Sequence, residues 1–235
     1  MELHSTKIEE TIATLSSRIS ERFAHSSLHS VSQDLLGIAQ RAEKTTDLIS
    51  KPILWLRIIN FILIALVFTG LAGTIYTFET PEGGFDFFDL IQVLEAGIND
   101  VVLIGAGIFF LISIETRVKR KRALAVLHEL RMIAHTIDLH QLQKDPERTL
   151  NYGTRTQSSP KDTMSAFELS RYLDYCSEML SLTGKIAALY VKEFEDSVTL
   201  SAVNEIESLT TGLSRKIWQK IMILHSLRPK DVQFT

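Results

Sequence analysis

The sequence predicts an all-α protein, in which a hairpin of two transmembrane helices accompanies a cytoplasmic helical bundle. Two long apolar runs predict the hairpin, because about 20 apolar residues in a helix cross a hydrocarbon core of ~30 Å. Elsewhere, apolar residues recur every three or four positions, which is typical of amphipathic helices and predicts the bundle. The 235 residues contain no alternating pattern typical of β-strands and no internal repeat.

Residues 1–50 are expected to form N-terminal cytoplasmic amphipathic helices. One apolar stripe has spacings of four, three, four and four, and comprises Ile8, Ile12, Leu15, Ile19 and Phe23. The serine-rich stretch 25–32 predicts a break, and a second helix over about 32–49 then leads into the membrane.

The first transmembrane helix is predicted over 51–78. Residues 53–78 contain a single charge, Arg57, and at 1.5 Å per residue they are long enough to cross a bilayer. Ser50 is expected to be the N-cap, with Pro52 in the first turn. Trp55 and Tyr76 lie near the two ends, where aromatic belts form.

The second transmembrane helix is predicted over 98–117. Its uncharged run, 101–114, is only 14 residues long and must therefore include neighbouring residues to cross. This range leaves Glu95 outside the transmembrane helix, because a carboxylate at mid-span costs about 2.5–3.5 kcal/mol of insertion free energy. Asn99 and Asp100 then fall in the first turn, within reach of the headgroups.

The charges that flank these helices predict that both termini are cytoplasmic. The connecting segment 79–100 has six acidic residues and no lysine or arginine, whereas a basic cluster follows the second span. This cluster is also expected to contact anionic lipid headgroups, and consists of Arg117, Lys119, Arg120, Lys121 and Arg122. Without an arginine-rich leader, the bacterial inner (plasma) membrane is the expected location.

The cytoplasmic helical domain is predicted over 118–235. No proline or glycine occurs between the second span and Pro146, so the helix is expected to continue to Leu142. Turn-forming residues predict a loop over 145–162. Ser165 and Glu168 predict a capping box that begins a helix reaching about residue 192, and a last helix is expected over 200–227. The only cysteine, Cys176, is expected to be a buried apolar side chain.

The acidic external segment, 79–97, is predicted to contain an amphipathic helix, for which two arrangements are possible. The helix can lie in the outer headgroup layer. Alternatively it continues the second span, with Gly97 as the position that decides between a bent and a straight helix. In that case Glu95, Asn99 and Asp100 from several copies would line a pore or vestibule that favours cations.

A histidine-bearing stretch offers a candidate metal site. His128, His135 and Asp138 share one helix face, and imidazole and carboxylate groups in this arrangement could hold a divalent metal. The stretch has no His-Glu-x-x-His pattern and no cysteine pair, and histidines are also common at packed helix contacts. No other cofactor is expected.

Three functional hypotheses follow. The sequence has no nucleophile triad, phosphate-binding glycine loop or dinucleotide fingerprint, so catalysis is not supported. A net charge of −3 gives no indication of nucleic-acid binding. The favoured hypothesis is a homo-oligomeric membrane scaffold or anchor whose cytosolic bundle binds a cytoplasmic protein. The alternatives are a small oligomeric cation channel and a membrane-bound metal-dependent enzyme.

Overall fold

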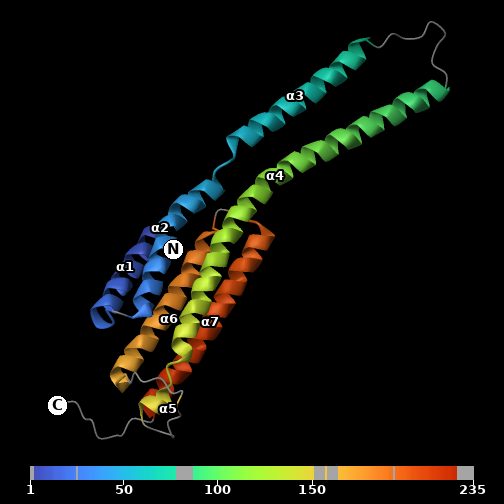
Figure 1. Cartoon of the computed structure of the whole chain (residues 1–235). Helices are drawn as coiled ribbons and strands as arrows, with labels where there is room; N and C mark the ends of the chain where they lie inside the picture. Colours follow the sequence, from blue (N-terminus) through green and yellow to red (C-terminus); the bar gives the residue numbers. More distant parts are fainter. Residues whose placement is uncertain are drawn as a thin grey trace. The chain divides into compact units, whose positions relative to one another are not determined.

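The computed structural model describes residues 3–24, 26–77, 87–150, 157, 164–192 and 194–226, and in this part of the chain all helices are α-helices and no strand occurs (Figure 1). The helices are α1 (Ser5–Arg22), α2 (Ser27–Ser50), α3 (Leu54–Thr77), α4 (Phe87–Leu142), α5 (Pro146–Thr149), α6 (Ala166–Leu189) and α7 (Ser197–Ser226). They form two compact units. The first contains residues 1–50 and 122–235, and the second contains residues 51–121.

The first unit is a helical bundle with α6 at its centre. Helix α6 contacts α1, α2 and α7, and it is buried on most of its surface. Its Leu173 and Ile186 are fully buried, as is Leu130 of α4. The N-terminal helices α1 and α2 therefore pack against the C-terminal helix α6.

The stripe predicted for the first helix is confirmed in α1. Ile8, Ile12, Leu15 and Ile19 are all buried. Helix α2, however, begins at Ser27, so the break between the two helices is shorter than the serine-rich stretch suggested. Leu28 is completely buried in the core of the bundle, and this packing outweighs the weak helical propensity of the serines.

Helix α4 is continuous over 56 residues. It passes Gly97 without a break and ends at Leu142, as predicted for its C-terminal end. A single glycine in a helix costs only about 1 kcal/mol, which its helical neighbours can offset. Of the two arrangements considered for residues 87–97, the helix thus adopts the one that continues into the second apolar segment. Residues 79–86 lie outside the described residues.

The two C-terminal helices begin with side-chain caps. The predicted capping box of Ser165 and Glu168 is present at the start of α6. Helix α7 begins at Ser197, three residues before the predicted position, because the carboxylate of Asp196 accepts hydrogen bonds from the backbone N–H and the hydroxyl of Thr199, both at 3.0 Å. The predicted loop contains the short α5, while 151–156 and 158–163 lie outside the described residues.

Two helical segments are long and apolar enough to span a membrane, one within 27–70 and the other within 97–142. Only 6% of the most apolar window of the first segment is buried, and none of that of the second. Phe61 and Phe109 are each 74% exposed. A core helix of a soluble protein would be covered by its neighbours, so length, composition and exposure all agree with a membrane-spanning role.

Candidate functional site

The first turn of α3 is capped by a carboxylate from α4. Glu115 Oε1 accepts a hydrogen bond from the backbone N–H of Ile53, at 3.2 Å. The prediction that Ser50 caps this helix is wrong, because Ser50 is the last residue of α2 and its hydroxyl donates to the carbonyl of Asp47. Pro52 lies between the two helices rather than in a first turn. Proline disfavours a helical conformation for the residue before it, so helices usually end at or before that residue.

Glu115 also pairs with two cations. Its carboxylate lies 3.1 Å from Lys119 Nζ and 3.5 Å from Arg57 Nε. Lys119 is only 9% exposed, so its charge is neutralised within the protein rather than offered to lipid headgroups. Of the predicted headgroup cluster, Arg117, Lys121 and Arg122 are exposed.

The part of α4 that belongs to the bundle has a second stripe, on the side opposite to its buried face. The buried face includes Leu127, Leu130 and Ala134. The residues of the second stripe alternate in spacing between three and four, are all exposed, and are named here the α4 outer stripe: Ala125, His128, Met132, His135, Leu139 and Leu142. Met132 is 52% exposed and Leu139 is 60% exposed, so two large apolar side chains of this stripe are uncovered in the single chain.

The predicted metal ligands do not come together as a site. His128 and His135 are exposed on α4, and Asp138 accepts a hydrogen bond from Gln141 Nε2 at 2.6 Å. Nowhere in the described part of the chain do three His, Cys, Asp or Glu side chains group in a way that could hold a metal ion. Glu205 of α7 approaches this region, but it forms an ion pair with Arg131.

The acidic residues considered for a vestibule lie on the continuous α4. Glu95, Asn99 and Asp100 are all exposed in the single chain. Their exposure is compatible with a ring formed by several copies and equally with contact to solvent or headgroups. The vestibule remains a prediction.

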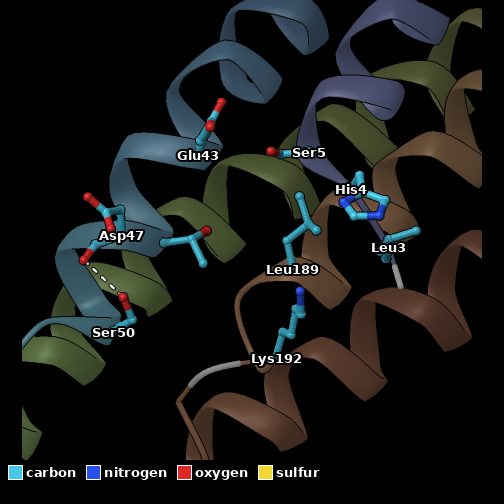
Figure 2. A pocket seen from close by; sticks show the side chains of 9 residues that line it. Leu3, His4, Ser5, Glu43, Asp47, Ser50, Leu189 and Lys192 are labelled. Atoms are coloured by element: carbon cyan, nitrogen blue, oxygen red, sulfur yellow. Dashed lines mark hydrogen bonds between the residues drawn. The ribbon is translucent and has the colours of Figure 1, made fainter. Parts of the chain in front are cut away.

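A small hollow lies where the start of the chain meets the ends of α2 and α6 (Figure 2). Its lining combines two carboxylates of α2 with the ammonium group of Lys192, and consists of Leu3, His4, Ser5, Glu43, Thr46, Asp47, Ser50, Leu189 and Lys192. The volume is about 210 Å³. Because sites for small molecules usually have volumes of ~300–1,000 Å³, we assign no ligand to it.

Lys220 of α7 stabilises the C-terminal end of α4. Its Nζ donates to the carbonyl oxygens of Gln141 and Lys144, at 2.6 and 3.0 Å. The carbonyl of Gln141 lies in the last turn of α4 and also accepts the backbone N–H of Lys144, at 3.1 Å. Burial lowers the pKa of Lys220. Cys176 is fully buried, which confirms the expected burial of its side chain, and this burial raises the pKa of the thiol to about 12.

His140 gives the bundle a predicted sensitivity to acid. Its Nδ1 lies 3.2 Å from the hydroxyl of Ser27, and burial, followed by the charge of Lys144, lowers the pKa of the imidazole. The folded state therefore disfavours protonation, so stability is present above pH ~6.5 and is lost as the pH falls below it. We expect unfolding of the full chain between pH 7 and 5 to show this loss, with a slope from this group of at most about 1.4 kcal/mol per pH unit. His140→Gln should reduce the slope, whereas His135→Gln, at an exposed position, should not.

The sequence did not reveal Glu115, Lys220 or the α4 outer stripe as notable features. The contacts of Glu115 and Lys220 join residues far apart in the chain, so no local signal exists for them. The outer stripe did have a signal, since its spacing can be read directly from the sequence. No protein-family model matches the chain, and comparisons with curated proteins and with solved structures found no match.

Proposed function

We propose that the protein is a homo-oligomeric scaffold, anchored in the bacterial inner membrane with both termini in the cytoplasm. The observation that carries this proposal is the α4 outer stripe, an exposed row of apolar and histidine side chains on the helix that continues from the second apolar segment. A three-and-four spacing is the pattern through which two helices pack as a coiled coil. We assign the stripe to contact with a second copy of the chain.

Membrane insertion makes a second copy a suitable partner. The apolar segments fix every copy in the same orientation, so the stripes of two neighbouring copies run parallel and residues of equal number face one another. The stripe extends over 18 residues, about 27 Å of helix. This is a short interface, but confinement to a bilayer raises the effective concentration of the copies, so modest contact energy suffices for association.

Cysteine cross-linking in membranes tests this proposal. Met132→Cys in the full chain should yield cross-linked dimers with a short bifunctional thiol reagent, because the two thiols would face one another across the interface. Cys176 is buried and does not contribute. Ser208→Cys, at an exposed position of α7, is the matched control and should give at least fivefold less dimer.

A charge introduced into the stripe provides the second measurement. The pair Met132→Glu and Leu139→Glu should shift the full chain in mild detergent from oligomer to monomer in size-exclusion chromatography with light scattering. Both residues are exposed in the single chain, so the bundle itself should keep its helical content. Equal cross-linking at residues 132 and 208, or an unchanged mass in the charged variant, would contradict the scaffold interface.

A further inference from the structure

A second hollow lies between α1 and α6, and its composition differs from that of the hollow in Figure 2. It has a volume of about 540 Å³ and is lined by Arg18, Glu21, Arg22, Phe167, Arg171 and Tyr175. This volume lies within the range of small-molecule sites. Three of the six lining residues are arginines, which suggests a negatively charged ligand. We refer to it as the arginine–aromatic hollow.

Each of the three guanidinium groups lies over an aromatic ring. Arg18 Cζ is 5.2 Å from the centroid of Tyr175, and Arg22 Cζ is 5.3 Å from that of Phe167. Arg171 Cζ is 5.9 Å from the same Phe167 ring. These cation–π contacts restrain the position of each guanidinium group without consuming its N–H donors.

The packing of α1 on α6 produces this arrangement. On α6, Phe167, Arg171 and Tyr175 follow one another at intervals of four residues, and on α1 the same interval separates Arg18 from Arg22. Residues four apart share a helix face, so the two rows meet where the helices touch. Tyr175 is 2% exposed and is also packed against the ring of Phe23, at 6.2 Å, which makes one side of the hollow rigid.

Most of the donors in the hollow have no acceptor among the residues that the structure describes. Each guanidinium has five N–H donors. Arg18 donates one hydrogen bond, to Glu178 at 3.1 Å, and Arg171 has a longer ion pair with Asp174, at 3.6 Å. Within the described residues, no carboxylate within 4.0 Å of Arg22 is found, but its charge is among the causes that lower the pKa of Glu168, after the hydrogen bonds from Ser165. Glu21 also lines the hollow and opposes a negatively charged ligand, but it leaves these donors available.

The positions of Arg22 and Arg171 give a further reason for an anion. Both cations lie within 6 Å of the same ring, Phe167, so they repel each other. An oxyanion that accepts hydrogen bonds from both would replace this repulsion by two attractive contacts. Phosphate suits the hollow better than a carboxylate, because it offers more terminal oxygens to the three guanidinium groups that line the hollow.

We propose that the arginine–aromatic hollow binds a phosphate group, supplied either by a soluble phosphate compound or by a phosphomonoester lipid headgroup. Arg22 and Arg171 donate hydrogen bonds to the phosphate oxygens, and Arg18 donates an additional one from the neighbouring turn of α1. The proposal does not depend on oligomerisation through the α4 outer stripe.

Calorimetric titration of the full chain with inorganic phosphate, in phosphatidylcholine nanodiscs, tests binding directly. We expect saturable binding with a Kd between micromolar and millimolar. Repeating the titration in discs that also contain phosphatidic acid distinguishes the two sources. A headgroup that occupies the hollow should weaken phosphate binding at least tenfold, whereas an unchanged Kd would identify a soluble phosphate as the ligand.

Variants at the hollow make the test specific. Arg22→Gln should weaken phosphate binding by about tenfold to a hundredfold, since a charge-assisted hydrogen bond is lost. Arg22 is exposed at the end of α1 and has no ion pair within the described residues, so this variant should fold normally. Arg22→Lys keeps the charge but loses the planar fork, and it should weaken binding about tenfold.

Arg41→Gln is the matched control, because Arg41 is an exposed arginine paired with Glu129 elsewhere in the bundle, at 3.0 Å. It should leave phosphate binding unchanged. Absence of saturable binding in phosphatidylcholine discs would overturn the proposal. So would equal affinities of the wild type and the Arg22→Gln variant, or equal losses in the Arg22→Gln and Arg41→Gln variants.

Discussion

Replacing Leu130 with alanine should lower the free energy of unfolding of the helical bundle by about 2–5 kcal/mol. Leu130 lies on the inner face of α4, has no exposed surface, and belongs to the core shared by α1, α2, α4, α6 and α7. Removing its three outer carbon atoms leaves a cavity that the packed neighbours can fill only in part. Urea unfolding of the full chain in mild detergent, followed by far-UV circular dichroism, measures the loss.

Met132 provides the control for this substitution, two residues away on the same helix. Its side chain is 52% exposed on the opposite face, so Met132→Ala should change the free energy of unfolding of the monomer by less than about 0.5 kcal/mol. Similar losses for the Leu130→Ala and Met132→Ala variants would mean that the inner and outer faces of α4 have been assigned incorrectly.

Replacing Glu115 with alanine should have the second-largest effect, a destabilisation of about 1–3 kcal/mol. The substitution leaves the buried Lys119 without its anion and leaves the backbone N–H of Ile53 without its acceptor. The expected loss is below that for a fully buried ion pair, because the partner Arg57 is 62% exposed. Unfolding by sodium dodecyl sulfate in mixed micelles is a suitable measurement.

Two further variants separate the roles of Glu115. Glu115→Gln keeps an acceptor for Ile53 but loses the charge, so its destabilisation should be intermediate. Glu129→Ala removes an ion pair with Arg41 in which both side chains are more than half exposed, and it should cost at most about 1 kcal/mol. If Glu115→Ala costs no more than Glu129→Ala, the network around Glu115 contributes little to the stability of the protein.

The sequence predicts those parts of the fold whose signals are local. The α1 stripe and the capping box of α6 were recognised because each lies within a few turns of one helix, where spacing alone determines the face or the cap. The continuation of α4 to Leu142 was predicted for a similar reason, the absence of a helix-breaking residue over that range.

The features that were wrong or missed depend on packing between distant segments. The start of α3 was misplaced because its cap is Glu115, 62 positions from Ile53 in the sequence. The capping of α4 by Lys220 was missed because it joins positions 79 apart. In both cases the polar group that satisfies a helix end comes from another helix, which no local pattern reveals.

For the candidate sites, the sequence predicts which residues share one helix face, but not whether that face is exposed or which other helix it contacts. Periodicity correctly placed His128 and His135 on one helix face, but only the packing of the bundle shows that this face is exposed and that α4 is buried on its other side. The sequence of α1 alone, or of α6 alone, does not predict the arginine–aromatic hollow. Arg18 and Arg22 acquire aromatic neighbours only when α1 packs on α6.

The packing of α1 and α2 against α6 has a consequence for biosynthesis. The first 50 residues leave the ribosome well before α6, which ends at Leu189, has been made. At about 5–20 residues per second, the N-terminal apolar stripes wait roughly 7–30 s for their partners. During this interval the two apolar segments are themselves synthesised. The bundle is therefore completed only after translation has passed both segments, and a ribosome-bound chain that stops before α6 should expose the stripe of α1 to chaperones and proteases.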